Sequence, residues 1–304
     1  MSTGRRIALA RPLVLVCLVA ALANCGDSNY SCAQFMGTAT HANWGIAWVF
    51  PGRLTADGKT IAGYPRIGSR GPVTAAADGG AVIAAGDDMI AVVDREQHRV
   101  ELPFPTLDIF ALALSRMGGT ALILAEDRNT HARRLLATPL LSPASTTDLA
   151  KILDWHGTDR SVRLTISTDG TLAALSSGRE CTVLGISAAS VVYRSTAEAC
   201  SISPDGRKLA LLDGGSGIVV ITVPSGSRVR WLKGRKVIGI GAWSPDGRYL
   251  AAGIFKRLHV YATLVAASID HEGACAIATL AEGDRGGGSS WIANEFLAAD
   301  RRPI

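Results

Sequence analysis

The sequence predicts an all-β fold, a six-bladed β-propeller whose closing blade is shared between the two termini. The main observation is a recurring phrase, which reads STDGTLA at 167–173, SPDGRKLA at 203–210 and SPDGRYLA at 244–251. A strand, an Asp-Gly turn and a second apolar strand is typical of a β-hairpin. Its return about every 40 residues is typical of the four-stranded blades of a propeller.

The amino terminus has the features of an export signal. Arg5 and Arg6 precede an apolar run at 13–23, which is shorter than a membrane-spanning helix. We therefore expect residues 1–24 to be a signal peptide. Once Arg5, Arg6 and Arg11 are removed, the net charge of +5 falls to about +2, so the composition gives no reason to expect a nucleic-acid partner.

Two ways of cleaving this signal remain open. Residues 21–23, Ala-Leu-Ala, fit ordinary cleavage, whereas residues 22–25, Leu-Ala-Asn-Cys, resemble the lipobox of bacterial lipoproteins, which implies a lipid on Cys25. Ordinary cleavage leaves five cysteines, an odd number in an oxidising compartment, and lipidation leaves four for pairing. We therefore favour a lipid-anchored envelope protein that faces the periplasm or exterior, with a tether at 25–42 and the propeller at 43–304. The alternative is a secreted soluble protein.

The corner turns and the apolar runs between them place the strands. Clear corners fall at Asp78-Gly79, Gly118-Gly119, Asp169-Gly170, Asp205-Gly206 and Asp246-Gly247, with a degenerate copy at 290–299. Third strands are expected at 89–94, 133–138, 181–187, 217–223 and 257–263. Fourth strands are expected at 99–103, 151–155, 190–194 and 228–232.

The last blade lacks half of its strands at the carboxyl end of the chain. Two strands at 45–50 and 59–65, joined by an Asp57-Gly58 turn, lie before the first complete blade. We therefore predict that each terminus gives two strands to the closing blade, which removes the open sheet edges.

The repeats resemble the WD-repeat-like propellers of the TolB type over nearly all of the mature chain. The resemblance rests on the phrase SPDGR-x-LA, and Val93-Asp94 is the nearest approach to a Trp-Asp pair. It implies an envelope protein that acts as a docking surface, and it brings no catalytic residues. We expect the motif aspartates to be turn formers: Asp78, Asp169, Asp205 and Asp246.

The strand map also suggests disulfide pairs. Cys181 starts a third strand and Cys200 starts the first strand of the next blade, so both lie at the same rim of the ring. Cys32 and Cys275 would then join the tether to the ring. Four cysteines allow three connectivities, and buried free thiols remain the alternative.

We expect no metal and no cofactor. The sequence has no GxSxG, HExxH or phosphate-loop motif, and its histidines lack ligand spacing. Asp270-His271-Glu272 is better explained as a solvated turn than as a metal site. The predicted innermost strands, at 74–77, 110–115, 163–167, 200–203, 241–244 and 289–292, carry no acid for an axial cation.

Two surfaces are candidates for partner binding. The loops between second and third strands, and those between blades, collect basic residues: Arg128, His131, Arg133, Arg134, Arg179, Lys233, Arg235, Lys236, Lys256 and Arg257. This face would suit an acidic protein, an acidic polysaccharide or lipid headgroups, unless these are ordinary solvated loops. The long link Pro139–Asp148, on the opposite face, is a second candidate.

Three classes of function therefore remain open. The first is a non-enzymatic interaction module of the cell envelope, which we expect to be monomeric. The second is a ligand-binding or sensory propeller, for which Ala75, Ala76 and Gly241 would leave room at the axis. The third is a hydrolase or lyase of polysaccharide, whose acids would come from loops between blades: Asp108, Asp159, Glu198 and Asp284.

Overall fold

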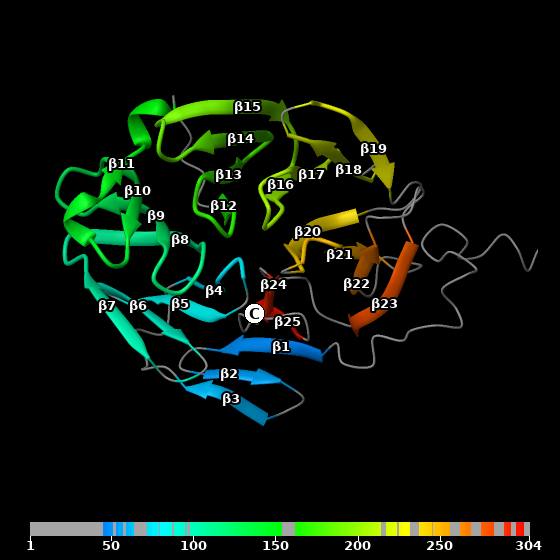
Figure 1. Cartoon of the computed structure of the whole chain (residues 1–304), viewed down its shortest axis with the longest axis horizontal. Helices are drawn as coiled ribbons and strands as arrows, with labels where there is room; N and C mark the ends of the chain where they lie inside the picture. Colours follow the sequence, from blue (N-terminus) through cyan, green and yellow to red (C-terminus); the bar gives the residue numbers. More distant parts are fainter. Residues whose placement is uncertain are drawn as a thin grey trace, which may run out of the picture.

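The computed structural model arranges six β-sheets around a common centre (Figure 1). It describes residues 45–50, 53–56, 59–63, 72–153, 162–213, 217–231, 237–255, 262–268, 275–282, 289–292 and 296–300, except for the single positions 79, 87, 95, 97, 224 and 245. Within these ranges the only helices are two short 3₁₀ turns. The prediction of an all-β propeller fold is confirmed.

Five sheets have four strands each, and in each sheet the strands follow one another along the chain. The first consists of β4 (Val73–Ala75), β5 (Ala81–Ala85), β6 (Met89–Asp94) and β7 (Arg99–Pro103). The second consists of β8 (Leu107–Leu114), β9 (Thr120–Asp127), β10 (Arg133–Pro139) and β11 (Thr147–Asp148). The third consists of β12 (Val162–Ile166), β13 (Leu172–Ser177), β14 (Glu180–Gly185) and β15 (Ser190–Thr196). The other two consist of β16 (Ala199–Ile202), β17 (Lys208–Leu212), β18 (Ile218–Thr222) and β19 (Arg228–Trp231); and β20 (Val237–Trp243), β21 (Tyr249–Phe255), β22 (Ala262–Ser268) and β23 (Cys275–Glu282).

The remaining sheet joins the two ends of the chain. Its strands, in spatial order, are β24 (Ser289–Ile292), β25 (Phe296–Asp300), β1 (Gly45–Phe50), β2 (Arg53–Ala56) and β3 (Lys59–Gly63). β1 pairs with β25 in parallel, and every other pair within the sheets is antiparallel. The amino-terminal end gives three strands where two were expected, because the segment between the expected strands is long enough to pair with both of them.

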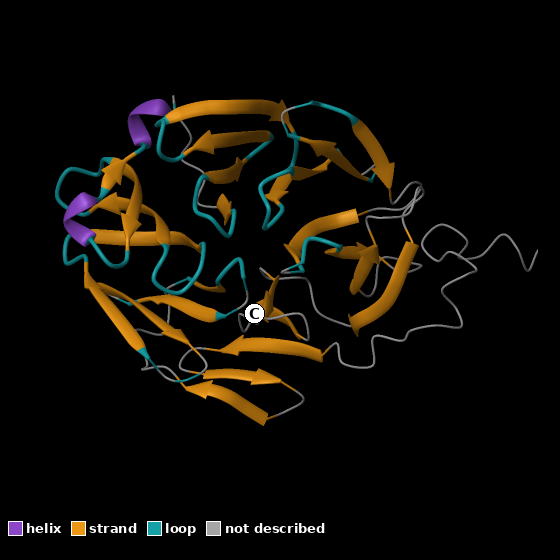
Figure 2. Cartoon of the chain, in the orientation of Figure 1, coloured by secondary structure: helices purple, strands orange, loops and turns teal. Residues whose placement is uncertain are grey.

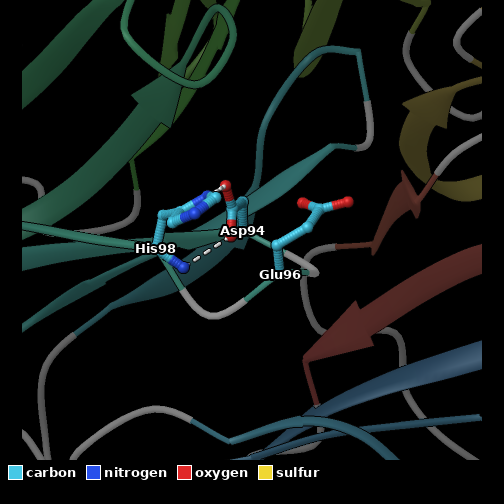
Figure 3. A group of neighbouring side chains, drawn as sticks. All are labelled: Asp94, Glu96 and His98. Atoms are coloured by element: carbon cyan, nitrogen blue, oxygen red, sulfur yellow. Dashed lines mark hydrogen bonds and ion pairs between the residues drawn. The ribbon is translucent and has the colours of Figure 1, made fainter.

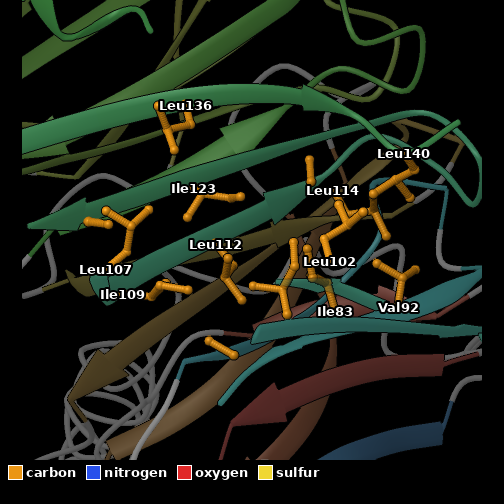
Figure 4. Close-up of a cluster of buried hydrophobic side chains, with 14 of the residues drawn as sticks. Ile83, Val92, Leu102, Leu107, Ile109, Leu112, Leu114, Ile123, Leu136 and Leu140 are labelled. Carbon is orange, nitrogen blue, oxygen red and sulfur yellow. The ribbon is translucent and has the colours of Figure 1, made fainter. Parts of the chain in front are cut away.

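The core lies between the sheets, where their faces pack against each other. Ile83 and Val92 from one sheet meet Leu112, Leu114 and Ile123 from the next (Figure 4). Similar clusters fill the next two interfaces. Because these sheets are covered on both faces, their middle strands are mainly apolar rather than alternating, and all five residues of β5 are buried. The outermost strands β7 and β15 are more exposed.

The fourth strand of the second complete sheet differs from the prediction. A strand was expected at 151–155, but the structure has the two-residue β11 followed by a 3₁₀ turn, Ala150–Ile152 (Figure 2). The cause is Asp148, whose carboxylate accepts from the backbone N–H of Ala150 (2.9 Å) and pairs with Arg134. This bond turns the chain away from the sheet after two residues. A second 3₁₀ turn, Pro143–Ser145, lies within the long link before β11.

The third strand of the fifth complete sheet is also shifted. It was expected at 257–263 and lies at Ala262–Ser268. β21 continues to Phe255, which is opposite Ala262 in the pairing of the two strands. A strand that began at residue 257 would leave one residue for the turn, which is too few for a hairpin.

Candidate functional site

Three of the corner turns between first and second strands are organised by a buried serine. The hydroxyl of Ser203 donates to Asp205 Oδ1 (2.6 Å) and accepts from the backbone N–H of Lys208 (2.9 Å). The same two bonds recur in the turns that begin at Ser167 and Ser244. The motif aspartates of these turns therefore hold the backbone, as expected from the sequence. The sequence analysis did not predict that the serine accepts a backbone N–H, although a serine stands two residues before the aspartate in all three phrases.

These turns lie on one side of the ring, which we call the corner face. It comprises the corner turns, which are the described residues of 76–80, 115–119, 167–171, 203–207 and 244–248. It also comprises the connections between third and fourth strands, which are the described residues of 94–98, 140–146, 186–189 and 223–227. The basic residues expected between second and third strands belong to the opposite face, because consecutive strands run in opposite directions.

An axial pocket opens near the corner face. Its lining residues come from the carboxyl-terminal halves of first strands or follow directly after them, and five sheets contribute: Thr74, Ala75, Ala76, Ala77, Ala113, Leu114, Leu164, Thr165, Ile166, Ser201, Ile202, Pro204 and Trp243. The pocket has a volume of about 430 Å³, part of which is open to solvent. Ala75 and Ala76, which were expected to leave room at the axis, are in its wall, and Gly241 is not among the lining residues.

The lining residues with polar side-chain groups are Thr74, Thr165, Ser201 and Trp243. Thr165 Oγ1 accepts from the backbone N–H of Ile202 (3.0 Å) and so joins two neighbouring sheets. The indole N–H of Trp243 donates to the backbone carbonyl of Ser201 (3.0 Å), which fixes the ring against the wall. Ser201 Oγ itself is buried and has no hydrogen-bond partner.

The long link between β10 and β11 presents an apolar side chain on the corner face. Leu140 is buried, and its backbone N–H donates to the carbonyl of Gly119 in the adjacent corner turn (2.8 Å). The next residue, Leu141, has 79% of its surface exposed. The link is therefore fastened to the ring at the residue that precedes an exposed leucine.

A group of three potential metal ligands also lies on the corner face. Atoms of Asp94, Glu96 and His98 lie within 4.8 Å of one another in the turn between β6 and β7 (Figure 3). His98 donates its backbone N–H to Asp94 Oδ1 (2.8 Å), and its Nδ1 lies 2.9 Å from Oδ2. Burial raises the pKa of the Asp94 carboxyl, but these hydrogen bonds outweigh burial and lower the pKa below its usual value. Because both oxygens serve the hairpin, the group is explained by turn formation and we assign no metal to it.

Five of the expected basic residues are described, and four of them have partners within the protein. Arg133 pairs with Glu126 (3.4 Å), Arg134 pairs with Asp148, and Arg128 donates to the carbonyl of Pro105 (3.2 Å). His131 shares Glu126 with Arg133. Arg179 is exposed on the turn between β13 and β14. Lys233, Arg235, Lys236, Lys256 and Arg257 lie outside the described residues, so a surface for anionic partners stays a prediction.

One of the two expected cysteine pairs is present as a disulfide. Cys181 of β14 and Cys200 of β16 are bonded, with their Cα atoms 5.9 Å apart, and both are fully buried. The bond crosses the interface between two consecutive sheets. Cys275 is the first residue of β23, and Cys25 and Cys32 lie outside the described residues.

The acids that an enzyme would need are not brought together among the described residues. Asp108 lies in β8 opposite Glu126 of β9. Glu198 is exposed in the connection between β15 and β16, which joins the next two sheets along the chain. Asp159 and Asp284 lie outside the described residues, as does Asp270-His271-Glu272. Within the described pocket wall no carboxylate is present.

A partly buried arginine, Arg163, was missed by the sequence analysis. Arg163 lies opposite Ser176, which in turn lies opposite Cys181, so the three form one row across the sheet. Its Nη1 atom is buried without a hydrogen-bond partner, and burial lowers the pKa of the guanidinium. In the sequence, apolar and polar residues alternate over Val162–Ile166, and this alternation predicts that the polar positions, including Arg163, lie on an exposed face.

The sheets arranged around an axial pocket define the protein as a β-propeller. Among solved structures, the chain is similar to TolB from Acinetobacter baumannii, with 15% sequence identity and a TM-score of 0.52 over 84% of this chain and 66% of that one. It is also similar to a putative TolB from Agrobacterium tumefaciens, with 14% identity and a TM-score of 0.55 over 81% of this chain and 94% of that one. This chain therefore spans just under two thirds of the Acinetobacter protein. At such identities the similarity shows the fold alone.

No protein-family model and no curated protein matches the sequence. Among the described residues, no helix has the length and apolar character needed to cross a membrane. Residues 1–44, with the expected signal, lipid-attachment site and tether, lie outside the described part of the chain.

Proposed function

We propose that this chain is an exported, non-enzymatic propeller that docks another protein of the cell envelope through its corner face. Residues 1–24 act as its export signal, and Cys25 carries the lipid that holds it at the membrane. The fold similarity to two TolB propellers and the lack of a carboxylate cluster in the described pocket wall support an interaction role over a hydrolase or lyase.

The same proposal includes a closed ring of six blades. Its closing blade combines strands from both termini, and the pairing of β1 with β25 supports this arrangement. A closed ring gives the corner face a fixed shape, because its turns cannot move independently of the sheets that carry them.

The choice of the corner face rests on one observation, the exposed Leu141 held beside a corner turn. On the opposite face Arg179 is exposed, but Arg133, Arg128 and His131 already have partners within the protein. Leu141, in contrast, is exposed to solvent. A docked protein would bury this apolar side chain, and the removal of apolar surface from water is favourable.

A photo-activated crosslinking residue at position 141, with position 129 on the opposite face as the matched control, tests this proposal. The full-length protein is crosslinked in native membranes, and its adducts are identified by mass spectrometry. We expect one stoichiometric envelope protein from position 141 only, and a Leu141→Asp variant should lose that protein. Adducts that are equal at both positions, or retained by Leu141→Asp, would reject the corner face as the docking surface.

A further inference from the structure

The link between β10 and β11 carries hydroxyl groups that the fold does not use. Residues 139–148 read PLLSPASTTD, with two serines, two threonines, two prolines and no charge before Asp148. Ser142, Ser145 and Thr147 are exposed, and in the described part of the chain their side-chain oxygens have no hydrogen-bond partner. These three hydroxyls are therefore open to solvent and to an enzyme.

The link holds these hydroxyls in a fixed turn. Pro143 begins the 3₁₀ turn Pro143–Ser145, and its carbonyl accepts from Thr146 Oγ1 (2.6 Å). Thr146 Oγ1 also lies within hydrogen-bond distance of Thr138 Oγ1 in β10 (3.2 Å). Ser142 stands at the N-cap, where a serine usually accepts a backbone N–H, but its hydroxyl makes no such bond. Thr146 thus supports the turn, and the hydroxyl of Ser142 has no part in it.

Length and composition distinguish the link from two other connections on the corner face. Seven residues, 140–146, separate β10 from β11, whereas four residues, 95–98 or 186–189, separate β6 from β7 and β14 from β15. A connection that is longer than its hairpin needs is often functional. A segment of serine, threonine and proline without charge is typical of chains that carry sugars on hydroxyl oxygens.

The disulfide of the ring indicates which modification suits these hydroxyls. The bond between Cys181 and Cys200 is typical of exported proteins, because the cytoplasm keeps thiols reduced. Phosphorylation needs ATP, which remains in the cytoplasm, whereas sugars are transferred to exported proteins from activated donors. The addition of a sugar is therefore the chemistry that suits an exported serine or threonine.

We propose that the link at 139–148 is a site of O-glycosylation, with Ser142, Ser145 and Thr147 as the sugar acceptors. The proposal rests on the export of this chain, which forms part of the proposed function. The hydroxyl oxygen forms a bond to the anomeric carbon of a phosphate-activated sugar, and the bond from that carbon to the donor phosphate breaks. The hydroxyl proton passes to a basic group of the transferase. Because Ser142 follows Leu141 directly, a sugar there also limits access to the proposed docking residue.

Intact mass spectrometry of the protein purified from native membranes tests this proposal. We expect its mass to exceed that of the processed and lipidated chain by one or more sugar units. Fragmentation of the purified protein should place every sugar within residues 139–148.

The same measurement separates failure of this inference from failure of the proposed function. A processed chain without added sugar, with a phosphate in its place, or with a sugar only elsewhere in the sequence would overturn the inference and leave export intact. A chain that retains residues 1–24 would reject the proposed export, and the inference with it.

Variants of the acceptors identify the hydroxyls. The combined variant Ser142→Ala, Ser145→Ala, Thr147→Ala should lose all of the added mass. Ser187→Ala, at another exposed serine of the corner face, is the matched control and should keep it. A sugar that persists in the combined variant would refute these acceptors.

Thermal unfolding shows that the loss of sugar does not reflect a damaged fold. The three side chains make no hydrogen bonds among the described residues, so their removal should leave the ring intact. The combined variant and the unchanged protein, both produced without glycosyltransferases, should therefore melt at the same temperature. A lower melting temperature in the variant would mean that these hydroxyls serve the fold, which would contradict the premise of the proposal.

Discussion

At the scale of single residues, the buried serine of the corner turn connects the repeated phrase to the fold. Ser203 is fully buried, and its hydroxyl is the acceptor for the N–H of Lys208, which begins β17. Replacing Ser203 by Ala leaves that N–H unpaired, so we expect a loss of about 1–3 kcal/mol in the free energy of unfolding. Urea denaturation measures it, with the exposed Ser187→Ala as the control. Equal midpoints for the two variants would show that the turn does not depend on the hydroxyl.

The aspartate of the same turn should make stability depend on pH. Burial raises the pKa of Asp169, but hydrogen bonds from Ser167 and from the backbone and side chain of Thr171 outweigh burial and lower its pKa. The ionised form of the Asp169 carboxyl is thus more stable, relative to the protonated form, in the folded protein than in the unfolded chain. This contribution is complete above the unfolded value of about 3.9 and is lost as the pH falls through the lower folded value.

We therefore expect the melting temperature to fall between pH 5 and pH 3, and to fall less steeply in Asp169→Asn, which keeps the turn-forming oxygen without the charge. Thermal unfolding across this range measures both slopes. Because Asp127 is shifted in the same direction, by hydrogen bonds from the backbone of Thr130 and Asn129, the variant should retain part of the dependence. A slope that Asp169→Asn does not change would exclude Asp169 as one of its causes.

At the scale of elements, strands with repeated corner phrases were predictable and those that depend on single side chains or turn lengths were not. The expected third strand at 89–94 coincides with β6, and the expected fourth strand at 99–103 coincides with β7. The strand expected at 151–155 was wrong, because local pattern does not show that Asp148 would bond to the N–H of Ala150 and end β11. The axial pocket was foreseen only as room left by Ala75, Ala76 and Gly241, and Gly241 is not among its lining residues.

The disulfide between β14 and β16 is expected to stabilise the contact of two consecutive sheets. Cys181 and Cys200 are 19 residues apart in the sequence, and a cross-link over this distance is worth about 3 kcal/mol, chiefly through the unfolded state. Urea denaturation of the oxidised and the reduced protein should show this difference. The double variant Cys181→Ala, Cys200→Ala should have the stability of the reduced form and no response to reductant. If reduction left the midpoint unchanged, the bond would contribute nothing to stability.

At the scale of the whole molecule, the pairing of β1 with β25 decides whether the ring unfolds as one unit. Removing residues 291–304 deletes β25 and part of β24, and it leaves β1 with an unpaired edge. In a closed ring every sheet is packed between two others, so the loss of one interface exposes apolar faces on both sides of the gap. We expect this deletion to abolish cooperative melting. Deletion of 301–304, which lies beyond β25, should have no such effect.

Hydrogen exchange shows whether the damage spreads around the ring. Leu122 and Leu124 of β9 are fully buried in a sheet far along the chain from the deleted segment. In a single cooperative ring their amides should lose protection together with those of the neighbouring sheets when 291–304 is removed. Protection retained in β9 while the end sheet is lost would mean that the sheets unfold separately. The ring would then be an open array, in which the terminal strands add one more sheet and do not close it.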